Sequence, residues 1–282
     1  MSDDVRMGGF NILPPVVKNL IIINVLFFLA KIVVDKFGID LDTWLGLHFF
    51  GASHFYPWQI ITYMFMHGDF GHLFFNMFAL WMFGAAIENY WGAKRFLIYY
   101  FVTGIGAGLT HYAVLAYQML PDLILINQYL DAPSYENLLA VAQGHVFHIG
   151  PYSGEIYDKF LAFQQLSISS NDTFALNQAT EFLAAYKEYY LNLPNVIGAS
   201  GAVFGLLLAF GMMFPNSQIY LYFLLPIKAK WFVIFYGALE LFYGVTGTQE
   251  GVAHFAHLGG MLFGILLILY WRKQNKRENY MY

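Results

Sequence analysis

The chain contains six apolar stretches, each close to the length that a helix needs to cross a lipid bilayer. They lie at roughly residues 17–35, 72–89, 95–117, 197–214, 226–245 and 252–271. A membrane-spanning helix needs about 20 predominantly apolar residues. Charged residues make up only 11% of the chain, against about 25% in soluble domains. The pattern predicts an all-α, polytopic membrane bundle of six transmembrane helices, with the aromatic first loop at residues 37–71 lying in the interface.

The distribution of lysine and arginine predicts the orientation of this bundle. Cytoplasmic loops of membrane proteins carry an excess of these residues. Ten of the fourteen basic residues fall on one side of the predicted spans: Arg6, Lys18, Lys94, Arg95, Lys228, Lys230, Arg272, Lys273, Lys276 and Arg277. We therefore expect both termini to be cytoplasmic, and the segment 118–194, which has two lysines and eight acidic residues, to face outward.

The segment 118–194 is unusually long for a loop. Long connections without secondary structure are uncommon in compact proteins, and residues 173–190 carry apolar side chains near a helical period. Four prolines divide the segment: Pro121, Pro133, Pro151 and Pro194. We expect a six-helix membrane domain over residues 1–271, interrupted by a helical outward-facing insert at 118–194 and followed by a basic cytoplasmic tail at 272–282.

The composition argues against several other classes of protein. The absence of cysteine excludes disulfides, thiolate nucleophiles and cysteine metal sites. A net charge of −4 and the lack of a basic stripe argue against a nucleic-acid partner. The first residues lack the short apolar region and cleavage site of a removable leader. A small chain without cysteine favours a bacterial inner membrane, and its oligomeric state stays open.

Four polar side chains occupy one depth of the predicted bundle. Ser200 lies about one turn into the fourth span, His257 about five residues into the sixth, and His72 and Asn76 open the second. Polar groups in lipid are costly and usually functional. The fourth span contains Gly201-xxx-Gly205 and the sixth contains Ala256-xxx-Gly260-xxx-Gly264. Because small residues at this spacing let membrane helices approach closely, we expect Ser200 and His257 to meet.

The chemistry of such a set is nucleophilic catalysis. A serine hydroxyl attacks well only when a base removes its proton, and histidine suits that role. His72, Asn76 and the Ser200 amide can donate hydrogen bonds to the negative charge that develops on a substrate carbonyl oxygen. The spans contain no aspartate that could orient His257, so we expect a dyad of Ser200 and His257 rather than a triad.

The same residues resemble the motifs of the rhomboid intramembrane serine proteases. The resemblance is carried by Gly198-Ala-Ser-Gly201, by Ala256-His257-x-x-Gly260-x-x-x-Gly264 and by His67-x4-His72-x3-Asn76, together with Trp58 and Glu88. Order and spacing match over most of residues 15–271 outside the insert.

This resemblance implies a role for each matching position. Ser200 is the nucleophile, His257 the base, and His72, Asn76 and the Ser200 amide form the oxyanion site. Phe204 matches an aromatic position that stacks near the catalytic histidine, and the supporting positions are Gly198, Gly201, Gly260 and His67. The implied activity is endopeptidase cleavage of transmembrane segments of single-span or polytopic membrane proteins, through an acyl-enzyme, without metal or cofactor.

Some positions depart from the resemblance or have no assigned role. Gln59 follows Trp58 where the family often has arginine, and Tyr90 stands two residues after Glu88 where a basic residue is often found. Both departures concern loop packing more than catalysis. We interpret Glu88 as a charge that fixes a loop. Glu240, inside the fifth span, either faces water or pairs across helices.

Other functions stay open at this point. The GASG segment alone favours a helix-packing patch with an incidental serine, and the four polar groups together favour catalysis. A non-enzymatic rhomboid-like factor that binds or escorts membrane proteins is the alternative, although such proteins usually lack the serine or the histidine. A metal-dependent enzyme or transporter using His67, His72, His254 and His257 is a third hypothesis, opposed by the lack of a HExxH motif and of a carboxylate in that set. We interpret His254 as an interfacial or supporting group and His67 as a residue that ties down its loop by hydrogen bonds.

Overall fold

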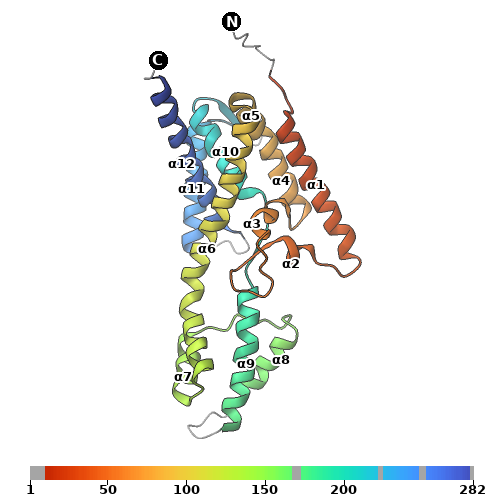
Figure 1. Ribbon diagram of the computed structural model, residues 1–282, viewed down its shortest axis with the longest axis vertical. Helices are drawn as coiled ribbons and strands as arrows, with labels where there is room; N and C mark the ends of the chain where they lie inside the picture. The colour runs from red at the N-terminus through yellow and green to blue at the C-terminus, as the bar shows by residue number, and fades with distance from the viewer. Residues whose placement is uncertain (1–9, 167–172, 222–224, 248–251, 280–282) are drawn as a thin grey trace. The chain divides into compact units, whose positions relative to one another are not determined.

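The computed structural model describes residues 10–166, 173–221, 225–247 and 252–279. Arg6, counted above for the orientation, lies outside them. The chain divides into two compact units. The first comprises residues 1–47, 57–111 and 196–282, and the second comprises residues 48–56 and 112–195. Most of the described residues are helical, as the sequence predicts (Figure 1).

The helices of the first unit match the positions of the six apolar stretches. They are α1 (Pro15–Asp35), α4 (Phe70–Ala79) continuing through a π-helical turn (Leu80–Gly84) into α5 (Ala85–Trp91), α6 (Ala93–Asp131), α10 (Ser200–Met213), α11 (Ala229–Thr246) and α12 (His254–Asn279). Within the described residues, four helical segments are long and apolar enough to cross a membrane: Pro15–Asp35, Phe70–Trp91, Ala93–Asp131 and His254–Asn275. The chain is therefore an integral membrane protein. Four of the six predicted spans thus have a helix of the required length and hydropathy. Of the other two, α10 is an apolar helix of only 14 residues, and α11, with 18 residues, is not among these four.

Several predicted helix boundaries differ from those in the structure. The fourth helix begins at Ser200 rather than near 197, because the backbone at Gly198 has a φ of +129° and is not helical. The third continues past 117 and through Pro121 to Asp131, although proline in a helix interior removes one backbone hydrogen bond and usually kinks or ends the helix. The sixth continues beyond 271 to Asn279, so the described part of the basic tail extends α12.

Short elements connect these helices. The first loop contains α2 (Leu41–Leu45), α3 (Gln59–Thr62) and a 3-10 turn (Tyr63–Phe65). The two-residue strands β1 (Leu47–His48) and β2 (Asn195–Val196) pair with each other. Strands β3 (Gln218–Leu221) and β4 (Leu225–Lys228) form an antiparallel hairpin before α11, in register Gln218 with Lys228. The start predicted for the fifth span, 226, therefore lies in a strand.

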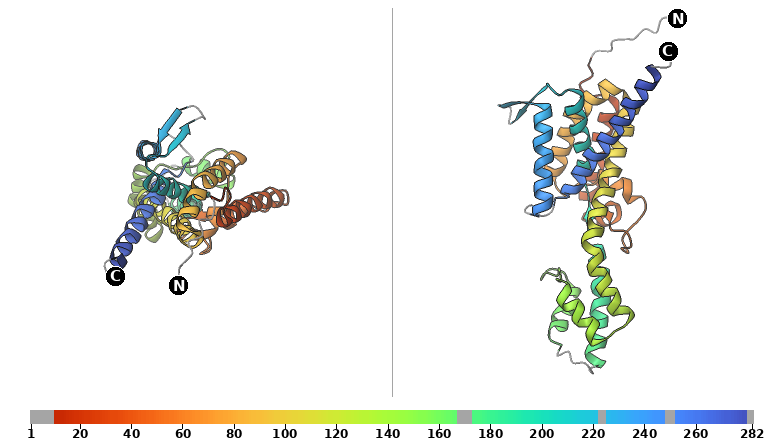
Figure 2. Two further views of the ribbon diagram at one scale, coloured as in Figure 1. Left: turned by 90° about the horizontal axis from the view of Figure 1, so that it is seen from above. Right: turned by 90° about the vertical axis from the view of Figure 1, so that its left-hand side faces the viewer.

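Close packing of α6, α10 and α12 depends on glycine. A Cβ built on Gly260 of α12 would lie 1.9 Å from the Gly201 carbonyl oxygen of α10, and one on Gly205 would lie 2.6 Å from Thr103 of α6. Backbone therefore meets backbone where α10 and α12 cross. Figure 2 shows the teal α10 beside the blue α11 and α12. The small-residue motifs thus mark the contact that the sequence predicted.

Glu88 fixes the beginning of α1. Its carboxylate accepts hydrogen bonds from the backbone N–H groups of Val16 (3.0 Å) and Val17 (2.8 Å). Glu88 is buried. The first N–H groups of a helix have no partner inside it, and a negative charge there contributes about 1–2 kcal/mol in partly buried sites. The loop-fixing role predicted for Glu88 is therefore the capping of a helix distant in sequence.

The first loop is held by backbone carbonyls. The Gln59 amide donates to the carbonyls of Thr43 and Trp44, each at 3.3 Å, and the Trp58 indole donates to Trp44 at 3.0 Å. Lys31 of α1 pairs with Asp42 and also donates to the His67 carbonyl at 3.0 Å. Gln59, the departure from the family pattern, thus uses its own side chain to hold the loop.

The second unit has a core of aromatic and aliphatic side chains. Its helices are α7 (Tyr135–Gly144), α8 (Glu155–Gln164) and α9 (Thr173–Asn192), together with the C-terminal part of α6 (Figure 1). The helix predicted at 173–190 is confirmed by α9. Phe163 and Phe182 stack with ring centroids 4.5 Å apart. The core also includes Met119, Leu123, Ile126, Tyr129, Leu138, Val141, Leu183 and Tyr186. Residues 118–194 thus contain a packed helical core rather than an extended loop.

Candidate active site

Ser200 and His257 meet where α10 and α12 begin. Ser200 is the first residue of α10, and His257 lies in the first turn of α12. The serine Oγ is 2.8 Å from Nε2 of His257. The crossing of the two helices at Gly201 and Gly260 brings these side chains together. The sequence placed Ser200 one turn inside its span, whereas the structure places it at the helix terminus, where backbone N–H groups and the positive end of the helix dipole lie.

Gly198 shapes the approach to Ser200. Its φ of +129° is a conformation that residues with a side chain rarely adopt. Its N–H donates to the Tyr63 carbonyl at 2.9 Å, which anchors the turn on the first loop. A Cβ at this position would lie 2.8 Å from Nε2 of His72 and 3.6 Å from Oγ of Ser200. The His72 ring therefore faces the backbone directly beside the serine.

Asp69 starts the helix that carries His72. Its carboxylate Oδ1 accepts the His72 backbone N–H at 2.9 Å. This hydrogen bond from His72 holds the pKa of Asp69 below its usual value. The capping aspartate fixes where α4 begins. The Asp-x-x-His spacing in the sequence is typical of such a cap, but the motifs above do not include Asp69.

Asn76 is buried one turn after His72. Its side-chain Nδ2 donates to the His72 carbonyl within α4 at 3.0 Å. An amide nitrogen carries two N–H groups, so this bond leaves a second donor. In this structure one N–H of Asn76 is thus engaged inside its own helix.

Phe204 covers one face of His257. The two rings are stacked with centroids 4.2 Å apart and an interplanar angle of 7°. Phe204 lies one helical turn after Ser200 on α10, so the helix that carries the serine also carries the ring that packs on His257. This contact limits rotation of the imidazole.

A carboxylate lies at the other nitrogen of His257, contrary to the expected dyad without one. Oε2 of Glu240 is 2.9 Å from Nδ1 of His257 and 2.7 Å from Nδ1 of His254. Glu240 lies on α11, about six residues before its end, a depth comparable to that of His257 in α12. The polar groups expected at this depth lie on the second, fourth and sixth spans, whereas this carboxylate comes from the fifth and is a glutamate rather than an aspartate.

His67 lies beside His72. The two rings lie edge to face with centroids 5.0 Å apart. Burial, reinforced by His72, lowers the pKa of His67 to about 4, so the ring is neutral at physiological pH. The loop is held at this residue through its backbone carbonyl and Lys31.

Glu240, His254 and His257 also form a set that could hold a metal ion. Their ligand atoms lie within 4.8 Å of one another. The structure thus has a carboxylate beside His254 and His257, contrary to the expected lack of one in the histidine set. His67 and His72 belong to the separate group beside Gly198.

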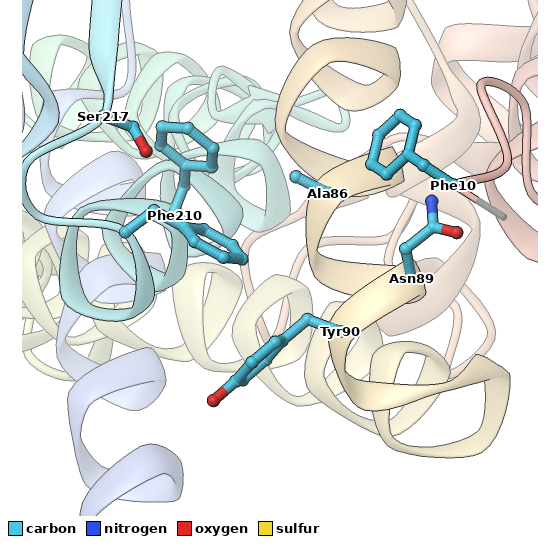
Figure 3. Close-up of a pocket in the computed structure, with 7 residues that line it drawn as sticks. Phe10, Ala86, Asn89, Tyr90, Phe210 and Ser217 are labelled. Atoms are coloured by element: carbon cyan, nitrogen blue, oxygen red, sulfur yellow. The ribbon is translucent and has the colours of Figure 1, made fainter. Parts of the chain in front are cut away.

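A pocket of about 400 Å³ lies away from this cluster. It is lined by Phe10, Ala86, Asn89, Tyr90, Phe210, Phe214 and Ser217 (Figure 3). Phe210 and Phe214 are ten or more residues from Ser200 along α10, about 15 Å by the helical rise. The lining is mostly apolar, and the pocket has no part in the Ser200 cluster.

Comparison with known proteins agrees with the motifs. The family model for the rhomboid domain matches residues 54–128 and 167–274, more than half of the chain. A rhomboid protease, GluP of Bacillus subtilis, is 35% identical over 60 residues, which cover 21% of this chain and 12% of that protein. An uncharacterized mitochondrial rhomboid protein of Schizosaccharomyces pombe is 23% identical over 227 residues, covering 77% of this chain and 52% of that protein.

A plant relative extends the comparison to a third group of organisms. Rhomboid-like protein 11 of Arabidopsis thaliana chloroplasts is 33% identical over 87 residues, covering 27% of this chain and 31% of that protein. The chain thus spans about half or less of the length of these curated relatives.

Proposed function

The chain belongs to the rhomboid family, and from that premise we propose that it is an intramembrane serine endopeptidase. The observation that carries the proposal is the 2.8 Å contact between Oγ of Ser200 and Nε2 of His257, made by two helices that cross at glycine. A hydroxyl at a helix N-terminus beside a histidine is the arrangement that nucleophilic catalysis requires.

The reaction would proceed through an acyl-enzyme. Ser200 Oγ attacks the carbonyl carbon of the scissile bond while its proton passes to Nε2 of His257. The negative charge on the carbonyl oxygen is stabilised by the Ser200 amide, by His72 beside Gly198 and by the second N–H of Asn76. His257 returns the proton to the leaving amine, and water then hydrolyses the ester by the same route in reverse.

The substrates would be transmembrane segments of single-span or polytopic membrane proteins. A peptide bond within a helix has to become extended before it can reach Ser200. Segments with small or helix-breaking residues near the outer interface unwind at lower cost, so we expect them to be preferred. The distribution of basic residues favours cytoplasmic termini and a Ser200 cluster that faces the outside, and the location we propose is a bacterial inner membrane.

The test is labelling with a fluorophosphonate, which reacts with activated serines. The purified protein should be labelled, and the label should disappear in Ser200→Ala and in His257→Ala while surviving a chelator. Ser217→Ala is the matched control, because Ser217 lies beside the pocket at the other end of α10. A folded protein that is never labelled, but still captures membrane proteins, would instead be a binding or escort factor.

A metal-dependent activity is the second candidate, favoured by the Glu240, His254 and His257 set. An ion bound to Nδ1 of His257 would leave the proton on Nε2, the nitrogen that faces Ser200. That nitrogen could then not accept the serine proton, so the two functions exclude each other. Activity that is lost with a chelator and tolerates Ser200→Ala would favour the metal.

A further inference from the structure

Glu240 places one carboxylate oxygen against two histidines of the same helix. Oε2 is 2.7 Å from Nδ1 of His254 and 2.9 Å from Nδ1 of His257. The three residues are buried, with exposed fractions of 8% for Glu240, 5% for His254 and 8% for His257. His254 and His257 are three residues apart and therefore lie on one face of α12.

A buried carboxylate requires partners. Removing an ion from water costs several kcal/mol unless hydrogen bonds compensate. The two imidazoles supply them if each carries a proton on Nδ1. A neutral imidazole has one N–H, so an Nδ1–H form leaves Nε2 as an acceptor. For His257, that acceptor lies 2.8 Å from Oγ of Ser200.

We propose that Glu240 is a positioning residue for the proposed hydrolysis, holding His257 as the Nδ1–H tautomer, and that His254 holds the carboxylate in place. This inference rests on the proposed function. When Nε2 takes the proton of Ser200, His257 becomes an imidazolium whose positive charge pairs with Glu240 through the same Nδ1–H. The proton then leaves from Nε2 to the amine nitrogen as the C–N bond breaks. Glu240 itself never accepts a proton, as in other carboxylate–histidine–serine sets.

Two supports thus act on the same imidazole. Phe204 stacks on its face, and Glu240 fixes its edge. The stacking restrains the ring plane but permits a flip that would exchange the two nitrogens. The hydrogen bond to Glu240 is what distinguishes Nδ1 from Nε2, so its loss should affect the chemical step while leaving substrate binding in place.

The kinetic test is Glu240→Gln, measured with a single-span substrate in proteoliposomes. The amide can donate as well as accept and so stabilises the wrong tautomer. We expect kcat to fall roughly 10²- to 10⁴-fold, with KM changed less than about threefold. His254→Gln tests the supporting contact instead, because it keeps an N–H toward Glu240 and leaves the Glu240–His257 contact intact. Its kcat should fall by no more than about tenfold.

The second readout does not depend on activity. Nitrogen-15 NMR of the histidine rings in detergent should show His257 protonated on Nδ1 in the wild-type protein and a loss of that preference in Glu240→Gln. An unchanged kcat in Glu240→Gln, an Nε2–H form in the wild type, or activity that a chelator removes would each overturn the proposal. A wild-type protein that neither cleaves nor is labelled would contradict the proposed function instead, and the NMR result would still decide whether Glu240 sets the tautomer.

Discussion

His257 in the membrane helices and His145 in the second unit have similar polar partners. His257 has the Glu240 carboxylate at one ring nitrogen, at 2.9 Å, and the Ser200 hydroxyl at the other, at 2.8 Å. His145 has the Asp122 carboxylate 3.1 Å from Nδ1, without the geometry of a hydrogen bond, and the Tyr186 hydroxyl 2.8 Å from Nε2. Both rings are buried. The order of groups, carboxylate, imidazole and hydroxyl, is the same in the two places. We call each of these sets of three groups a relay.

The surroundings of the hydroxyl differ. Ser200 is partly exposed at the start of a helix, with Gly198 and the His72 ring beside it. Tyr186 is fully buried among aromatic rings, and its hydroxyl also accepts the His148 backbone N–H at 3.3 Å. Burial raises the pKa of Tyr186 to about 12, so the phenol stays neutral. We infer that a carboxylate, an imidazole and a hydroxyl do not by themselves make a reactive site, because the hydroxyl also has to be reachable and to have hydrogen-bond donors for a developing oxyanion beside it.

The largest difference in cleavage rate between the two places should appear when His257 and His145 are each replaced. His257→Ala should lower kcat for a membrane substrate by about 10⁶-fold, the scale seen when a serine or its base is removed elsewhere. His145→Gln should leave kcat within about twofold, because Tyr186 is not a nucleophile in this proposal. Cleavage assays in proteoliposomes with a melting curve for each variant would measure both. Equal losses in two folded variants would break the comparison.

The second largest loss of cleavage rate is expected when the contact between α10 and α12 at Gly260 is disturbed. A Cβ on Gly260 would lie 1.9 Å from the Gly201 carbonyl oxygen, so Gly260→Ala has to move α12 away from α10. A displacement of about 1 Å in a catalytic pair costs roughly 10²-fold in rate. Gly150→Ala in the second unit is the control, since nothing lies within 4 Å of that position. A Gly260→Ala enzyme with wild-type kcat would show that the distance between Ser200 and His257 does not depend on this contact.

The sequence predicted the contact between Ser200 and His257, but neither of the two carboxylates that lie beside His257 and His145. Apolar length and small-residue spacing predicted the helices and the meeting of Ser200 with His257, because both patterns are local and periodic. Glu240 was left without a role because its partner lies on another helix, and only a comparison of depths across all six spans would have joined them. The neighbours of His145, Asp122 and Tyr186, are 23 and 41 residues away from it in sequence, so no local motif points to their contact.

Local rules also failed where tertiary structure overrides them. Pro121 was expected to divide the insert, but α6 continues through it. The helix runs for many residues on both sides of the proline, and its residues Met119, Leu123 and Ile126 pack in the core of the second unit. The start of α10 was placed near 197 by hydropathy, whereas the unusual backbone of Gly198 delays it to Ser200. That shift puts the serine at the helix terminus, a feature that hydropathy cannot resolve.

A smaller effect is expected for the donors beside the serine. Asn76→Ala should slow cleavage about 10- to 10³-fold, because one hydrogen bond to the oxyanion is lost. The variant should remain folded, since the bond to the His72 carbonyl lies within a helix that Asp69 still caps. Single-turnover rates would measure the chemical step. An unchanged rate would remove Asn76 from the oxyanion site and leave His72 and the Ser200 amide as the donors.

The smallest effect on the cleavage rate is expected for Tyr186→Phe, which tests whether the relay of the second unit is structural. Tyr186→Phe removes the hydroxyl that meets His145 and accepts the His148 N–H. Leaving such buried groups unpaired costs about 1–3 kcal/mol, which hydrogen exchange of the α7 and α9 amides in the full chain would report as faster opening. Tyr152→Phe is the control, because Tyr152 is fully exposed. The cleavage rate should not change with either variant, since the phenol of Tyr186 stabilises a fold and does not touch substrate. If Tyr186→Phe slowed the chemical step without loosening α7 and α9, the two relays would have to be considered functionally connected, and the distinction drawn from their surroundings would fail.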